Sequence, residues 1–83
     1  MSFKLTLSRP VEIDGASVSV ITLREADMND IINAKLDILH PEKMMPEQIN
    51  RLIANLSNWT PEQTGKMKPK DWAKCSEYAL SVF

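Results

Sequence analysis

The sequence predicts a small α+β fold, with an N-terminal antiparallel β-hairpin in residues 1–25 followed by three to four α-helices in residues 26–83. Apolar and polar residues alternate on both sides of an Asp14-Gly15 pair, which is typical of a hairpin. Beyond the hairpin, apolar residues instead recur with the period of a helix face, and prolines stand where helices would begin. A chain of this length is expected to form a single domain, 1–83.

The hairpin turn is predicted at Asp14-Gly15, because a tight two-residue turn needs positive φ and glycine adopts it without steric cost. The first strand is expected over residues 3–7, and the alternation continues through residues 11–13 up to the turn. The return strand is expected over residues 17–23.

Two features predict an irregular ladder between these strands. Pro10 cannot donate a backbone hydrogen bond, so it marks an edge position, a bulge or a break. In the return strand, the face that carries the apolar residues changes between Val20 and Ile21. A bulge near Val20, or coverage of both faces of the strand, would reconcile the two halves.

A first helix is expected to begin after Asp27, whose side chain suits the N-cap position, and Asp30 adds negative charge to the first turn, where the helix dipole favours it. The helix is expected to end before Pro41, because the residue that precedes a proline avoids the α region. Residues 40–45 would then form a linker. The apolar residues at helical spacing in this element are Met28, Ile31, Ile32, Leu36 and Leu39.

Prolines at first helical positions predict the later helices. Pro46 begins a helix that closes near Asn58. Thr60 is the N-cap of a capping box that starts a short helical turn, and Gly65 stops this turn. Pro69 begins the last helix. The apolar stripe after Pro46 is Ile49, Leu52, Ile53 and Leu56, and the expected inward face of the last helix is Trp72, Cys75, Ser76, Ala79 and Val82 or Phe83.

The composition argues against several classes of protein. The chain is 43% hydrophobic and 25% charged with a formal net charge of −1, which disfavours strong nonspecific binding to nucleic acid or to an anionic membrane. Cys75 is the only cysteine, so no internal disulfide can form and a reducing compartment is expected. The N-terminus lacks the continuous apolar stretch of a signal peptide, and no apolar run approaches the roughly 18 residues that span a bilayer. We therefore expect a soluble, cytoplasmic protein.

Few residues could support catalysis or metal binding. His40 and Cys75 are the only residues of their types and lie far apart in the sequence, so neither a Cys–His nucleophile nor a structural zinc site is predicted. The two glycines, Gly15 and Gly65, form no phosphate-binding loop. We therefore predict a non-enzymatic protein without cofactor or metal.

Lysines crowd the start of the last helix around Trp72, and three interpretations remain open. They can form a solvated turn that Asp71 compensates, or a docking site for an acidic protein partner. They can also bind nucleic acid, with lysine on phosphate and Trp72 stacked on bases. The lysines are Lys66, Lys68, Lys70 and Lys74.

A series of short motifs recurs in a recognisable order. The positions that carry it are Pro10, Asp14, Gly15, Thr22, Leu23, Arg24, Glu25, Leu52, Leu56, Ser57, Asp71 and Phe83. In order and spacing they resemble the small tail assembly chaperones of long-tailed bacteriophages and prophages, most closely the Mu-like group. Ala26 departs from the proline that is usual in that family, and Asn58-Trp59 departs from its usual glycine and apolar residue.

The resemblance implies a non-catalytic chaperone that binds the phage tape measure protein and keeps it soluble during tail morphogenesis. The tail tube protein and a second copy of the chain, forming a homo-oligomer, are further candidate partners; nucleic acid and membrane are not expected partners. The family's role places the protein in the host bacterial cytoplasm and outside the mature virion. The alternatives are a small nucleic-acid-binding or regulatory phage module and a structural tail subunit.

The partner is expected to dock on helical apolar faces, because addition of a strand to the hairpin edge would recognise only backbone and pair indiscriminately. The lysines would then steer an acidic flank of the partner. The candidate partner-binding residues are Ile31, Leu39, Met44, Met45, Ile49, Ile53, Lys68, Lys70 and Trp72.

Overall fold

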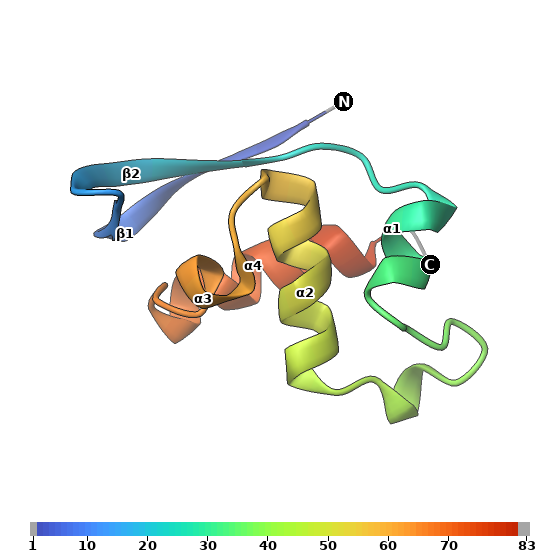
Figure 1. Ribbon diagram of the computed structural model, residues 1–83. Coiled ribbons are helices and arrows are strands. Elements are labelled where there is room, and N and C mark those ends of the chain that lie inside the picture. The colour runs from blue at the N-terminus through green and yellow to red at the C-terminus, as the bar shows by residue number, and fades with distance from the viewer. Residues whose placement is uncertain (1, 82–83) are drawn as a thin grey trace.

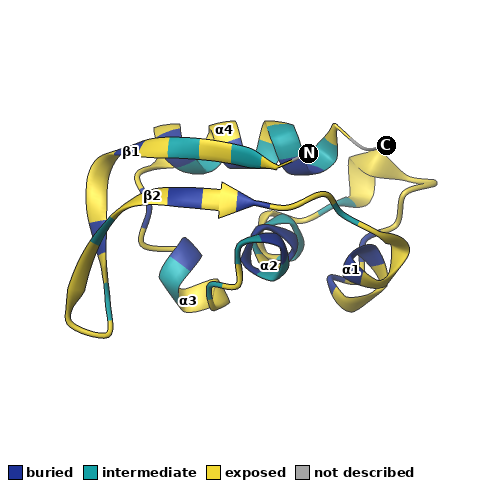
Figure 2. Ribbon diagram, turned by 90° about the horizontal axis from the view of Figure 1, so that it is seen from above, coloured by how far each residue is buried: buried dark blue, intermediate teal, exposed yellow. Residues whose placement is uncertain are grey.

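The computed structural model describes residues 2–81 and contains a hairpin and a layer of helices. Its elements are β1 (Phe3–Ile13), β2 (Ala16–Leu23), α1 (Met28–Asn33), the 3-10 helix η1 (Pro41–Lys43), α2 (Pro46–Ser57), α3 (Pro61–Thr64) and α4 (Pro69–Leu80). The hairpin lies over the helices, and α1 lies at the opposite end of the molecule from the hairpin turn (Figure 1). Seen from above, β1 runs alongside α4 and β2 lies nearer α2 (Figure 2). This arrangement confirms the predicted α+β fold, an antiparallel hairpin followed by helices.

The hairpin turn lies where the sequence predicts it. Asp14 has φ 53° and Gly15 has φ 81°, and Ile13 pairs with Ala16 across the turn. Two consecutive residues at positive φ match the right-handed twist of the flanking strands. β1 is longer than the expected strand of residues 3–7, because it continues through the bulge up to the turn.

A bulge in β1 connects the hairpin to α4. The ladder is regular up to Thr6 and resumes at Val11, so the missing N–H of Pro10 interrupts no regular pairing. Within the bulge, the backbone N and the Oγ of Ser8 donate to Oδ2 of Asp71 at 3.0 and 2.9 Å. Asp71 is only 1% exposed, so these bonds supply the partners that a buried carboxylate needs.

The first helix is shorter than predicted. α1 ends at Asn33, so the expectation of a helix reaching residue 39 was wrong. Lys35 adopts the left-handed conformation with φ 59°, and the N–H of Leu36 donates to the carbonyl of Ile31 at 3.2 Å. This is a left-handed C-terminal cap of the Schellman type, and it returns Leu36 to the core that also holds Ile31. Glycine is the usual residue at the left-handed position, and lysine gives no such signal.

The predicted starts of the later helices are confirmed. α2 begins at Pro46 and is followed by Asn58 at φ 64°, and α4 begins at Pro69. At the start of α3, Oγ1 of Thr60 accepts from the backbone N of Gln63 at 3.2 Å, while Oε1 of Gln63 accepts from the N of Thr60 at 3.0 Å. This is the expected capping box.

The core lies between the hairpin, α2 and α4. Leu52 and Ile53 of α2 are fully buried, as are Cys75 and Ala79 of the expected inward face of α4. Trp72 and Ser76 are half-buried, and Val82 and Phe83 lie outside the described residues. No helix within residues 2–81 has the length and apolar character needed to cross a bilayer.

Candidate partner-binding surface

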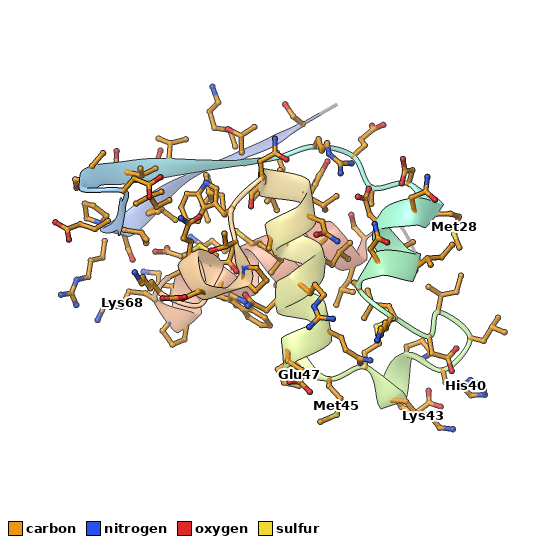
Figure 3. The ribbon with its side chains drawn as sticks, viewed as in Figure 1. Met28, His40, Lys43, Met45, Glu47 and Lys68 are labelled. Carbon is orange, nitrogen blue, oxygen red and sulfur yellow. The ribbon has the colours of Figure 1, made fainter. Side chains whose placement is uncertain are left out.

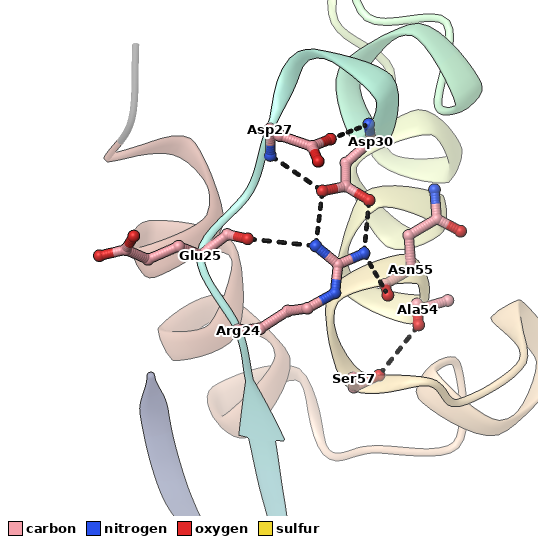
Figure 4. A network of polar contacts seen from close by, with 7 residues as sticks. All are labelled: Arg24, Glu25, Asp27, Asp30, Ala54, Asn55 and Ser57. Carbon is pink, nitrogen blue, oxygen red and sulfur yellow. Dashed lines mark hydrogen bonds and ion pairs between the residues drawn. The ribbon is translucent and has the colours of Figure 1, made fainter. Parts of the chain in front are cut away.

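Arg24 joins the end of β2 to both α1 and α2 (Figure 4). Its Nη1 and Nη2 donate to Oδ2 and Oδ1 of Asp30 at 2.8 and 2.6 Å. Its Nη2 also donates to the carbonyl of Asn55 at 3.4 Å, and its backbone N donates to the carbonyl of Leu56 at 3.1 Å. A two-pronged arginine–carboxylate pair constrains orientation as well as distance. This group of contacts, named the Arg24 clamp, holds α1 against the C-terminal part of α2.

Asp30 contributes to the clamp from the first turn of α1. Its Oδ2 accepts from the backbone N of Asp27 at 2.9 Å, and Oδ1 of Asp27 accepts from the backbone N of Asp30 at 3.1 Å. The hydrogen bond from Arg24 holds the pKa of Asp30 below its ordinary value of 3.8, although burial acts in the opposite direction. The carboxylate therefore stays charged at neutral pH, and the ion pair persists.

The segment between α1 and α2 is held by short polar contacts, and the expected linker of residues 40–45 contains η1. Gln48 of α2 donates from Nε2 to the carbonyl of Lys35 at 3.0 Å, and its Oε1 accepts from the N of Met45 at 2.8 Å. Oδ2 of Asp37 lies 2.8 Å from Nδ1 of His40, and this contact lowers the pKa of Asp37. Both ends of the segment are thereby anchored.

Residues 28–45, which comprise α1 and this segment, carry most of the exposed apolar side chains. Of the six large apolar residues that are exposed within residues 2–81, five lie between positions 28 and 45. Leu39 is 81% exposed and Ile32 is 63% exposed. Met28 and Met45 lie on the side of the molecule away from Lys68 (Figure 3). The five residues, named the 28–45 apolar surface, are Met28, Ile32, Ile38, Leu39 and Met45.

The predicted partner-binding residues fall into different environments. Leu39 and Met45 belong to the 28–45 apolar surface. Ile31 and Ile53 are 7% and 0% exposed, so their side chains do not lie at the surface of this chain. The remaining two apolar candidates, which are half-buried and pack against the core, are Met44 and Ile49.

The other three predicted residues lie away from that surface. Lys68 and Lys70 are exposed at the start of α4, and Lys68 lies on the opposite side of the molecule from Met28 (Figure 3). The half-buried Trp72 donates from Nε1 to Oδ1 of Asn50 in α2 at 2.9 Å. The structure therefore separates the lysines from the 28–45 apolar surface instead of placing them beside it.

Met28, Ile32 and Ile38 are exposed residues that were not among the predicted partner-binding residues. The pattern assigned Met28 and Ile32 to the same helical stripe as Ile31, without indicating which of them face solvent. The short length of α1 decides this, because a helix of six residues presents little area to the core. The sequence gives no signal for this length, because the left-handed cap at Lys35 has no glycine to mark it.

Within residues 2–81, exposed apolar side chains that could bind a partner are easier to identify than reactive groups that could support catalysis. Cys75 is fully buried, and burial, with a contribution from Asp71, raises the pKa of its thiol to about 11. The thiol therefore stays protonated and weakly reactive. Within residues 2–81, no group of three or more His, Cys, Asp or Glu side chains is placed to hold a metal ion.

A comparison with known families gives a match over nearly the whole chain. The model of the family described as "Phage tail assembly chaperone proteins, E, or 41 or 14" matches residues 4–83. The matched range includes the hairpin except for Phe3, the Arg24 clamp and the 28–45 apolar surface. No curated protein and no solved structure matches the chain.

Proposed function

The chain belongs to the family of phage tail assembly chaperone proteins, and we propose that it binds the tape measure protein of its phage through the 28–45 apolar surface. It keeps this long helical partner soluble until the tail tube forms around it. The action is non-catalytic and takes place in the host bacterial cytoplasm, and the chaperone is released before the virion matures. The tail tube protein is a second candidate partner at the time of release.

The observation that carries the proposal is the concentration of exposed apolar side chains in one segment. Fully burying a leucine, isoleucine or methionine side chain is worth about 1.5–3 kcal/mol relative to leaving it exposed. Several such side chains are needed, because association itself has a large entropic cost. Leu39 and Ile32, with exposed fractions of 81% and 63%, have the most surface left to bury.

Two methionines suit this surface to a partner with many similar but non-identical helical segments. Methionine is unbranched and polarizable, so it adapts its shape to different neighbours. Met28 and Met45 are each 54% exposed and lie at the two ends of the segment. The Arg24 clamp holds α1, which carries Met28, and Oε1 of Gln48 accepts from the backbone N of Met45, so both side chains can adapt on an anchored backbone.

Co-expression with the tape measure protein encoded in the same genome tests the proposal. We expect the tape measure protein to move from the insoluble to the soluble fraction and to co-purify with the chaperone. Unchanged solubility together with the absence of a complex would contradict the proposal. Mass spectrometry of purified virions tests the alternative of a structural tail subunit, which would remain in the particle.

A further inference from the structure

A cavity lined by basic side chains that form no ion pair within residues 2–81 lies between the bulge of β1 and the connection from α3 to α4. Its volume is about 420 Å³, and its lining includes Arg9, Lys66 and Lys68 but only one carboxylate, that of Glu12. None of the three cations forms an ion pair with another residue of the described chain 2–81. The cavity therefore has an excess of positive charge that the chain itself does not neutralise.

Part of the lining of this cavity is apolar, and part of the lining is shared with a second cavity. Val11 and Met67, which are 3% and 6% exposed, contribute to the apolar part. Met67 and Pro69 also line the second cavity, which has a volume of about 370 Å³ and includes Pro46 and Trp72. The two cavities share Met67 and Pro69 at the start of α4, and together they are named the Met67–Pro69 groove. Glu47, which lines the second cavity, is the second carboxylate of this groove, against the three cations of the first cavity.

Polar contacts beneath the second cavity fix the position of Trp72. Oδ1 of Asn50 accepts from Nε1 of Trp72 at 2.9 Å and from Oγ1 of Thr64 at 2.7 Å, while Nδ2 of Asn50 donates to the carbonyl of Pro61 at 2.9 Å. The indole N–H is thus already satisfied, so Trp72 offers a ligand its apolar ring surface. Half-buried tryptophan in a pocket is a common anchor in protein interfaces.

We propose that the Met67–Pro69 groove binds one extended, acidic segment of a protein partner. Carboxylates of the segment lie among Arg9, Lys66 and Lys68, and leucine or proline side chains next to them lie against Met67 and Trp72. The proposal rests on the proposed function in one respect, since the segment would belong to the partner that the chaperone holds. The groove is separate from the 28–45 apolar surface and forms a second point of contact.

Charge and shape favour an acidic peptide over nucleic acid at this site. A peptide of this kind complements both the cations and the apolar part of the lining, whereas a nucleic-acid backbone would match only the cations.

A free peptide tests the groove without the tape measure protein. The probe is a short blocked peptide with several glutamates followed by Leu-Pro-Leu, and binding is followed by the fluorescence of Trp72 in the full chain carrying Trp59→Phe. We expect saturable binding that weakens with added salt, because exposed charge pairs are screened. Replacing the glutamates by lysines, or Leu-Pro-Leu by Ser-Gly-Ser, should each weaken binding about tenfold or more.

Charge reversal in the protein locates the binding site. Arg9→Glu with Lys68→Glu should weaken peptide binding about tenfold, since each exposed pair contributes a factor of a few. The matched control, Lys4→Glu with Lys43→Glu, changes the net charge equally outside the groove and should leave binding unchanged. Equal binding by both double variants, or no binding of the glutamate peptide to the parent protein, would overturn the proposal. Stronger binding of a single-stranded oligonucleotide than of the peptide would also overturn it.

Discussion

The core between the hairpin, α2 and α4 and the segment 28–45 use the same types of apolar side chain for opposite purposes. In the core, Ile21, Leu23 and Ile53 are all 0% exposed. In the segment, Ile32 and Leu39 keep more than half of their surface exposed. The difference therefore does not come from composition.

The two regions differ in how much structure is available to cover them. The core is closed by elements that are distant in sequence, with β1 against α4 and β2 against α2. The segment has a helix of six residues, and the left-handed cap at Lys35 ends that helix after less than two turns. Apolar residues beyond the reach of the core then remain at the surface, where a partner can cover them.

The largest expected effect is the difference in the free energy of unfolding between a substitution in the core and one in the segment 28–45. Ile53→Ala should lower the free energy of unfolding by about 3 kcal/mol, because it leaves a cavity in the core. Ile32→Ala should change it by less than about 0.5 kcal/mol, because the side chain is largely exposed. Urea unfolding followed by circular dichroism measures both. Equal losses in the two variants would mean that the segment is packed as tightly as the core.

The second effect concerns the Arg24 clamp, which joins α1 of the segment 28–45 to α2 of the core. Arg24→Ala should lower the free energy of unfolding by about 2 kcal/mol, because it leaves the nearly buried carboxylate of Asp30 without its main partner. Arg51→Ala is the matched control on the exposed face of α2 and should cost less than about 0.5 kcal/mol. If the two arginine variants unfold at the same urea concentration, the clamp does not contribute to stability.

Acid should weaken the same contact. Because the folded-state pKa of Asp30 lies below its ordinary value of 3.8, its contribution to stability is complete above that value and is lost as the pH falls through the folded-state pKa. Asp30→Asn should be less stable than the parent at neutral pH, and the difference should shrink as the pH is lowered below about 3.8. Unfolding curves over this pH range provide the measurement, and a constant difference would contradict the assignment.

The smallest expected effect on stability tests whether α1 ends at the left-handed residue Lys35. Lys35→Gly should raise the free energy of unfolding by about 0.5 kcal/mol, because glycine adopts positive φ without strain. Lys43→Gly serves as the control, since Lys43 lies in η1 outside the residues with positive φ. A loss of stability in Lys35→Gly equal to that in the control would show that residue 35 is not in the left-handed conformation.

Local signals in the sequence accounted for much of the fold. Asp14-Gly15, Pro46 and the capping box at Thr60 each act within a few residues, so the hairpin turn and the helix starts could be predicted. The cap at Lys35 could not, because its residue type does not reveal its conformation. The family resemblance drew attention to Arg24 without indicating its pairing with Asp30.

The candidate surface was harder to predict than the fold. Helical periodicity groups Ile31, Ile32 and Leu39 together, but burial depends on contacts made across the chain. The bond between Ser8 and Asp71, which joins positions 63 residues apart, shows how far such contacts reach. Of the predicted partner-binding residues, Leu39 and Met45 are exposed, whereas Ile31 and Ile53 lie in the core.

Binding of the tape measure protein by surface variants tests the central claim most directly. The test variant is Ile32→Glu with Leu39→Glu in the 28–45 apolar surface, and the control is Val20→Glu with Thr22→Glu on the exposed face of β2. Both add the same charge, and thermal unfolding confirms that each is folded. We predict that the tape measure protein co-purifies with the parent and with the β2 variant but stays insoluble with the Ile32 and Leu39 variant. Co-purification with the Ile32 and Leu39 variant in the same yield as with the parent would contradict the claim.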